Sequence, residues 1–246
     1  MKLNQLLKTL DTISPFERQA EWDNSGLCIG DENQEIEHIY LSLDADKEVI
    51  EQMPENALLV VHHPPIFKGL KSLHHDSYPS SFLISAIKKN IAIISMHTNY
   101  DLSHLNVYVL EEVLGYKVIK EEGHLCYFKV DKPFDTFSLE IGEKLGIDNL
   151  SVVKCHANIA TAALCTGSGA DLIPQVEADC FLTGDIKYHS AKEAYENGLS
   201  LIDVKHYESE RFFAVSLQKE LKNYGLNGII ANSKNPFSTI SKDKQP

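Results

Sequence analysis

Short apolar runs alternate with segments of helical spacing along the first half of the chain. The runs His38–Leu43, Ala57–Val61 and Ile91–Ser95 are rich in Ile, Val and Leu and predict strands. Asp46–Met53 and Tyr78–Lys89 lie between these runs and have the spacing of helices. Because strands buried on both faces read as continuous apolar runs, this alternation indicates a largely parallel sheet covered by helices.

Amphipathic helices are predicted at both ends of this half. The leucines of Met1–Phe16 recur at helical spacing between polar residues, which differs from the unbroken apolar core of a signal peptide. Ser103–Leu114 shows the same kind of spacing. No apolar stretch reaches the roughly 18 residues of a membrane-spanning helix. We therefore expect a cytoplasmic protein that does not associate with membranes.

The second half of the chain continues the alternation. Strands are predicted at Leu125–Val130, Val152–Lys154, Ile159–Cys165, Cys180–Leu182, Leu199–Val204 and Gly228–Ala231, and helices at Thr136–Leu145, Ala170–Val176, Lys187–Asn197 and Glu208–Lys222. The fold class that follows is α/β, with mixed, mostly parallel sheets flanked by helices. A soft boundary between two halves lies near residues 115–123, where charge rises between apolar stretches.

Composition narrows the functional classes. With 246 residues, 43% of them hydrophobic, the chain can bury a large core in one large domain or two small ones. The formal net charge of −12 and the absence of a Lys/Arg block argue against nucleic-acid binding. The five cysteines form no Cys-x-x-Cys pair, so we expect buried, reduced thiols rather than a thiolate zinc site.

Two adjacent histidines, His62 and His63, follow the run Ala57–Val61 and precede two prolines. Prolines end sheet pairing, and loops at the carboxyl ends of strands are the usual ligand sites of α/β sheets. Successive side chains of extended backbone point to opposite faces. The pair is therefore poorly placed to chelate one ion, and each histidine is expected to reach a different ion.

Two further clusters of the same kind follow predicted strands. His97 and Asp101 come after Ile91–Ser95, although Asp101 or Ser103 would equally serve as the cap of the next helix. His206 and Glu210 come after Leu199–Val204, four residues apart. That spacing places both on one face of a helix, which is a common metal-ligand pattern and also a common solvated face.

Taken together, His62, His63, Asp101, His206 and Glu210 offer three imidazoles and two carboxylates. One tetrahedral ion needs about four ligands, whereas five suit two ions roughly 3.5–4 Å apart that share a carboxylate. Glu210 is the bridging candidate, with one oxygen for each ion. Nitrogen and oxygen ligands without thiolate fit Zn²⁺, Mn²⁺, Fe²⁺, Co²⁺ or Ni²⁺ and do not choose among them.

Three other segments have two interpretations each. Lys187 lies in a polar stretch after a short strand, where it would meet an anionic substrate, while nearby Asp185 either lines a pocket or caps a helix. Trp22, the single tryptophan, is either a core anchor or a pocket wall. The Gly-rich residues 165–170 match no phosphate-binding fingerprint and are expected to form a plain turn rather than a phosphate cradle.

The order of these segments resembles the GTP cyclohydrolase 1 type 2 family, also called Ngg1-interacting-factor-three-like proteins. The resemblance runs from AEWDNSGL through VVHHPPIF and MHTNYD to TGDIKYH and DVKHYESE, and so covers nearly the whole chain. It implies two metal ions held by the same five residues. It also implies a single domain over 1–246 with two related α/β modules, roughly 1–118 and 119–246, and toroidal homohexamers with the metal sites facing a cavity.

The resemblance further implies a metal-dependent hydrolase that converts GTP and water into 7,8-dihydroneopterin triphosphate and formate. In that reaction His97 would act as the catalytic proton shuttle, because its unperturbed pKa lies near neutrality. The alternatives are a phosphoesterase using the same two ions and a non-catalytic, metal-binding ring protein. One departure from the family pattern stands beside the site, since Lys205 occupies the position before His206 where the family commonly has Gly.

Overall fold

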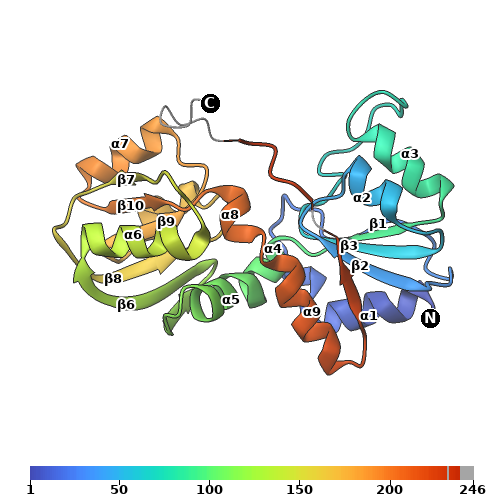
Figure 1. Ribbon diagram of the computed structural model, residues 1–246, viewed down its shortest axis with the longest axis horizontal. Helices are drawn as coiled ribbons and strands as arrows, with labels where there is room; N and C mark the ends of the chain where they lie inside the picture. The colour runs from blue at the N-terminus through green and yellow to red at the C-terminus, as the bar shows by residue number, and fades with distance from the viewer. Residues whose placement is uncertain (232, 239–246) are drawn as a thin grey trace, which may run out of the picture.

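The computed structural model describes residues 1–231 and 233–238, arranged as two β-sheets with helices on their outer faces and between them (Figure 1). The first sheet has the strand order β1-β4-β3-β2-β11. Its strands are β1 (Gly26–Ile29), β2 (His38–Ser42), β3 (Ala57–Val61), β4 (Ala92–Ser95) and β11 (Gly228–Ile230). Strands β11, β2, β3 and β4 run parallel and β1 runs antiparallel to β4.

The second sheet has the order β5-β6-β8-β9-β10-β7. Its strands are β5 (Val118–Glu122), β6 (Leu125–Pro133), β7 (Ser151–Val153), β8 (Asn158–Leu164), β9 (Cys180–Thr183) and β10 (Ser200–Asp203). Only the β8-β9 and β9-β10 pairings are parallel, while β5-β6, β6-β8 and β10-β7 are antiparallel. The expected α/β class with mixed sheets is confirmed, and its parallel part is concentrated in the first sheet.

The helices have these bounds: α1 (Leu3–Ile13), α2 (Lys47–Gln52), α3 (Ser80–Lys88), α4 (Thr98–Tyr100), α5 (Asn106–Tyr108), α6 (Phe134–Leu145), α7 (Tyr188–Glu196), α8 (His206–Glu210) and α9 (Phe213–Asn223). The 3-10 helices η1 (Phe16–Arg18) and η4 (Ala170–Gln175) are short. The π-helical segments η2 (Asp101–Leu105) and η3 (Val109–Val113) continue α4 and α5, so the backbone is helical from Thr98 to Val113. No helix within the described residues is both long and apolar enough to cross a bilayer.

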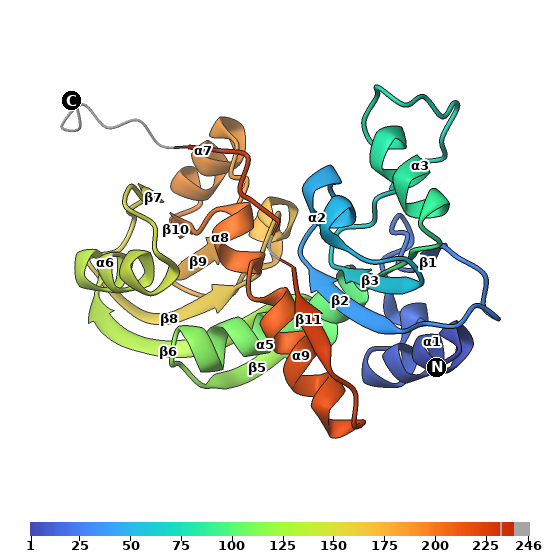
Figure 2. The ribbon, with the colours of Figure 1, turned by 45° about the vertical axis from the view of Figure 1, so that its right-hand side comes forward.

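One apolar core joins the two sheets. It includes Leu6 of α1, Leu58 of β3, Leu105 of η2, Phe137 of α6 and Leu217 of α9, all buried. Two smaller cores lie on the outer faces, under α2 and α3 on the first sheet and under η4 and α7 on the second. The helical segment from Thr98 to Val113 therefore lies between the sheets, as Figure 2 shows.

Two predicted helices differ from the structure. The helix expected from Ser103 begins at Thr98, because the Asp23 carboxylate accepts hydrogen bonds from the Thr98 backbone N–H (3.1 Å) and hydroxyl (2.5 Å). The helix expected at Glu208–Lys222 is two helices, α8 and α9.

The final strand, β11, returns to pair with β2, so the sheets do not divide the chain at a single point.

Candidate metal centre

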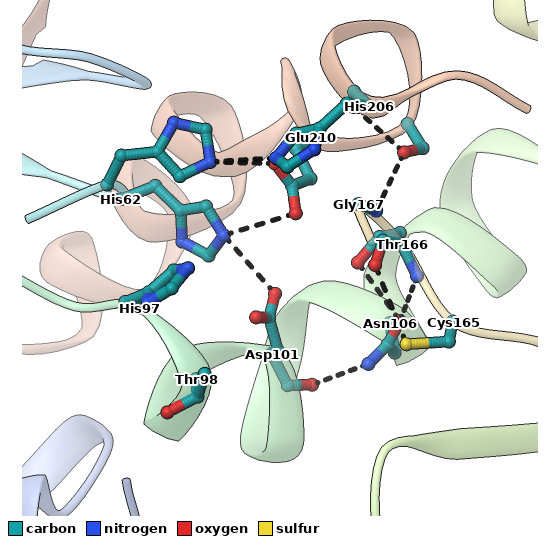
Figure 3. A network of polar contacts seen from close by, with 12 residues as sticks. His62, His97, Thr98, Asp101, Asn106, Cys165, Thr166, Gly167, His206 and Glu210 are labelled. Atoms are coloured by element: carbon teal, nitrogen blue, oxygen red, sulfur yellow. Dashed lines mark hydrogen bonds and ion pairs between the residues drawn. The ribbon is translucent and has the colours of Figure 1, made fainter. Parts of the chain in front are cut away.

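The carboxyl ends of strands from both sheets supply the side chains of the site. His62 and His63 directly follow β3, and their backbone N–H groups donate to Leu43 O, both at 3.1 Å. Asp101 lies one helical turn beyond β4. His206 and Glu210 occupy the first and last positions of α8, after β10 of the second sheet. The five residues predicted as ligands come together in two groups. Figure 3 labels four of them, His62, Asp101, His206 and Glu210.

The first group of three consists of His63, His206 and Glu210. The Oε2 atom of Glu210 lies 2.9 Å from the Nε2 atoms of both His63 and His206. The two Nε2 atoms are themselves 3.2 Å apart. Both imidazoles thus aim the same ring nitrogen at the same carboxylate oxygen.

The second group consists of His62, Asp101 and the other oxygen of Glu210. His62 Nε2 lies 3.3 Å from Asp101 Oδ1 and 3.6 Å from Glu210 Oε1. His62 is fully buried, and its Nε2 and Asp101 Oδ1 have no hydrogen-bond partner of acceptable geometry. As expected from extended backbone, His62 and His63 reach different groups, and Glu210 contributes one oxygen to each.

Each of these imidazoles is fixed through its Nδ1 atom. Nδ1 of His62 lies 2.9 Å from Met96 O, while Nδ1 of His63 and His206 lie 2.7 Å from Asp44 Oδ1 and Asp185 Oδ2. An acceptor at Nδ1 places the proton there and leaves the Nε2 lone pair free for a cation. Asp185 therefore holds a histidine, and the helix-cap interpretation of Asp185 is wrong, since Lys187 is the N-cap of α7.

The donor set fits metal ions. Ligands about 2.0–2.1 Å from a tetrahedral Zn²⁺ lie about 3.3 Å from each other, which is the range of separations within both groups. Two Nε2 atoms in contact cannot both donate a proton to each other, whereas a cation between them accepts both lone pairs. Buried donor atoms without partners are likewise costly unless an ion completes the site. The clustered, buried His, Asp and Glu side chains are thus compatible with metal binding.

Without an ion, the charges of the cluster shift its titration. Burial disfavours the charged forms, but the Asp101 and Glu210 carboxylates raise the pKa of His62 above its usual value. Burial likewise opposes ionisation of Glu210, yet hydrogen bonds from His206 and His63 and the nearby charge of His62 hold its pKa well below the usual range. Despite burial, Glu210 and Asp185 raise the pKa of His206 to about 9. A cation entering the cluster must displace these protons.

Glycine 167 makes room for the shared carboxylate. A Cβ atom at Gly167 would lie 1.8 Å from Glu210 Oε1, and the φ angle of +64° also favours glycine. The backbone N–H groups of Thr166, Gly167 and Gly169 donate to side chains of Asn106, Ser209 and Thr183. Since these N–H groups are occupied, this Gly-rich turn supports the site and is not a phosphate cradle.

His97 lies beside both groups but, unlike the other three histidines, makes no contact with the carboxylates of Asp101 or Glu210. Its Nδ1 atom lies 2.7 Å from Asp23 Oδ1, and its ring centroid is 5.1 Å from that of His62 and 5.7 Å from that of His63. His62, His63 and His97 form a third group whose nitrogens lie within 4.8 Å of one another. Asp101 lies inside the helix with His97 as N-cap, so neither Asp101 nor Ser103 caps it.

Lys187 is exposed at the start of α7 and makes no ion pair or hydrogen bond through its side chain within the described residues. Lys205, directly before His206, forms an ion pair with Asp203 (Nζ to Oδ2, 2.6 Å). Its backbone angles, φ 60° and ψ 158°, belong to a region that glycine adopts far more readily. The departure from glycine at this position is therefore accommodated with backbone strain.

A cavity of about 960 Å³ opens beside His63 and His206. Its wall includes one lysine, Lys205, and these carboxylates: Asp44, Asp148, Asp185, Asp203 and Glu208. The cavity is therefore predominantly acidic on this side of the site.

The sequence analysis did not identify Asp44 and Asp23, which hold His63 and His97. Asp44 follows β2, as the ligands follow β3 and β4, so the same strand-end rule would have found it. Asp23 left no such signal, because it acts on His97 and Thr98 from about 75 positions away. Trp22 is 62% exposed, which excludes a core anchor.

The chain matches a known protein family over most of its length. The family model for Duf34/NIF3 (NGG1p interacting factor 3) matches residues 1–236. A Campylobacter jejuni protein named GTP cyclohydrolase 1 type 2 homolog is 50% identical over 238 residues, which are 96% of this chain and 99% of that protein. A Helicobacter pylori protein named GTP cyclohydrolase 1 type 2 is 40% identical over 240 residues, 97% of this chain and 99% of that protein.

The fold is shared with solved structures. A Staphylococcus aureus hypothetical protein superposes with a TM-score of 0.87 at 28% identity, covering 98% of this chain and 99% of that one. HcgD from Methanocaldococcus jannaschii superposes with a TM-score of 0.79 at 28% identity, covering 94% of this chain and 97% of its own. Because the family model spans nearly the whole chain and full-length relatives reach 50% identity, this protein belongs to the Duf34/NIF3 family.

Proposed function

We propose that this protein is a two-metal hydrolase that opens the imidazole ring of GTP, with water as co-substrate and 7,8-dihydroneopterin triphosphate and formate as products. The observation that carries the proposal is the Glu210 carboxylate, whose Oε2 faces His63 and His206 while its Oε1 faces His62. A carboxylate shared by two ligand groups is typical of dinuclear hydrolytic centres. The names of the two bacterial relatives support the same reaction.

The side chains divide the work. His62, Asp101 and Glu210 Oε1 would hold one divalent cation, and His63, His206 and Glu210 Oε2 the other. Bound ions of this kind supply Lewis acidity and lower the pKa of a water molecule. The donor set admits Zn²⁺, Mn²⁺, Fe²⁺, Co²⁺ or Ni²⁺.

His97 would move the proton. Asp23 fixes its Nδ1, so that Nε2 accepts a proton from water and returns it to the substrate. The buried Asp23 carboxylate accepts four further hydrogen bonds, from Asn24, Ser25 and Thr98, and this network holds the His97 ring in place. Contact of Lys187 with the phosphates remains a prediction.

The test is reconstitution. The protein is purified without oxygen, loaded separately with Zn²⁺, Mn²⁺ or Fe²⁺, and given GTP while formate and the fluorescence of the pterin product are followed. We expect formate release that disappears in His97→Ala, which keeps its metal. Protein that holds two ions per chain and releases no formate with any of these metals would refute the proposal.

The acidic cavity favours a second candidate function, a metal-binding protein without turnover. Five carboxylates leading to His63 and His206 would attract cations and repel triphosphate. In that case metal exchange would be fast, and neutralising Asp148 and Glu208 would slow metal uptake. The metal-loaded protein would form no product from GTP. The toroidal homohexamer implied by the family resemblance also remains a prediction, which analytical ultracentrifugation would test.

A further inference from the structure

Three aromatic rings form a wall on the His97 side of the metal centre. The ring centroids of Trp22 and Phe67 are 5.8 Å apart, and both lie within 6.4 Å of the centroid of His97. Trp22 is 62% exposed and Phe67 45% exposed. None of the three residues lines the acidic cavity beside His63 and His206. The wall therefore belongs to a different approach to the same centre.

Hydrogen bonds from neighbouring residues fix the aromatic wall in place. Asn24 donates from Nδ2 to Ile66 O at 2.6 Å and so ties the turn after Trp22 to the segment that carries Phe67. Asp23, next to Trp22, holds the His97 ring through the 2.7 Å contact with Nδ1. Large exposed apolar side chains fixed in this way at the edge of a polar centre are typical of binding sites.

Near the aromatic wall, two lysines stand against the exposed carboxylate of Glu21, whereas the cavity is predominantly acidic. Lys68 and Lys71 follow Phe67 on an exposed loop, and neither forms an ion pair within residues 1–231 and 233–238. Among the described residues that line the acidic cavity, the single lysine, Lys205, forms an ion pair with Asp203. An anionic molecule is therefore favoured on the Phe67 side of the centre over the acidic cavity.

We propose that Trp22, Phe67 and His97 form the contact surface for a planar aromatic heterocycle, and that Lys68 and Lys71 bind anionic groups attached to it. Because the Phe67 ring is inclined by 54° to Trp22 and by 81° to His97, the heterocycle stacks on Phe67 and meets the other two rings at an angle. The ligand class is a purine nucleotide or a similar anionic heterocycle. This inference rests on the proposed function in placing the substrate: the ring stacks beside the metal centre, and the phosphates lie over the loop after Phe67. Base stacking on aromatic side chains is tolerant of sequence and substituents, which suits a single exposed platform.

Trp22 is the single tryptophan of the chain, so its fluorescence reports on the wall directly. The full-length protein is loaded with Zn²⁺, which has a filled d shell and no redox chemistry. It is then titrated with GTP, with guanosine, and with inorganic tripolyphosphate. We expect GTP and guanosine to quench Trp22 and tripolyphosphate to leave its emission unchanged.

Matched variants separate the two parts of the site. Phe67→Ala should weaken GTP and guanosine binding about 5- to 100-fold, the range of one lost stacking contact. Tyr188→Ala, which removes another exposed aromatic ring from the start of α7, should change neither. Lys68→Ala with Lys71→Ala should weaken GTP binding but not guanosine binding. Metal content is measured in every variant and should stay at the wild-type value.

Several results would overturn the inference. These are no quenching by GTP or guanosine, equal affinities in Phe67→Ala and the wild type, and a Trp22 emission that shifts on dilution, which would show that a second copy of the chain covers the wall. Formate assays keep this inference distinct from the proposed function. Quenching without formate release would support the stacking surface and refute the hydrolase function. Formate release by Phe67→Ala at the wild-type rate would refute the stacking surface and support the hydrolase function.

Discussion

Lys205 provides a quantitative test of backbone strain beside the metal centre. With φ 60° and ψ 158°, it occupies a conformation that is nearly exclusive to glycine. Gly184 explains why the chain cannot relax easily, since a Cβ there would lie 2.6 Å from the Lys205 carbonyl carbon and 2.8 Å from the His206 nitrogen. We compare Lys205→Gly with Lys205→Ala, because both variants lose the same ion pair with Asp203.

The expected difference follows from two opposing effects. Glycine removes a strain of about 2 kcal/mol, within a range of roughly 1–3 kcal/mol. It also adds conformational freedom to the unfolded chain, which costs about 0.7 kcal/mol. Lys205→Gly should therefore be more stable than Lys205→Ala by about 1.3 kcal/mol, or about 3–5 °C in Tm for a chain of this size. The lost ion pair is partly exposed and contributes at most about 1 kcal/mol in either variant.

The assay is reversible unfolding of the metal-free proteins in urea, followed by far-UV circular dichroism and by Trp22 fluorescence. Coincident transitions would justify a two-state free energy. The metal-free state is used because metal binding would add its own stabilisation. Equal midpoints for the two variants, or a more stable Lys205→Ala, would refute the claim that this backbone is strained.

The remaining predictions concern the metal centre. Glu210→Ala should lose metal from both groups while His206→Ala should keep one ion, as measured by elemental analysis after reconstitution, and two ions retained in Glu210→Ala would exclude a shared carboxylate. Gly167→Ala should displace Glu210 Oε1, which a new Cβ would approach to 1.8 Å, and so empty the His62 group first. The Zn²⁺ affinity should rise with pH through about pH 9, because the ion must displace a proton from His206, whose pKa is raised to about 9 in the metal-free protein. Chelator competition at several pH values measures this, and a flat profile would contradict it. Asp44→Asn, which weakens the acceptor at His63 Nδ1, should lower Zn²⁺ affinity about 10- to 100-fold by the same assay, and unchanged affinity would show that Asp44 does not support the ligand.

Several elements could be predicted because their signals are local. The buried strand Ala57–Val61 is found at its predicted bounds, since five consecutive apolar residues before two prolines leave little choice of conformation. The spacing of His206 and Glu210 predicted a shared helix face, and α8 spans those two residues. The clustering of ligand types at strand ends likewise followed from where loops lie in α/β sheets.

Other features depend on partners far along the chain. The helix start at Thr98 is fixed by Asp23, about 75 positions earlier, so the local apolar spacing placed the start five residues late. The short strand β1 was not predicted, because its residues become a strand only by pairing with β4. The final strand joins the first sheet by pairing with β2, which lies about 190 positions earlier in the chain.

The sequence by itself determined which side chains are available and at which strand ends they lie, because hydrophobic spacing and proline positions act over a few residues. Only the tertiary structure decided which oxygen of Glu210 faces which histidines, that Asp44 and Asp185 orient His63 and His206, and that Trp22 stands exposed beside His97. The physical reason is that hydrogen bonds, ion pairs and ring contacts require separations of a few ångströms between atoms. Such separations between distant segments arise when both sheets pack on one common core.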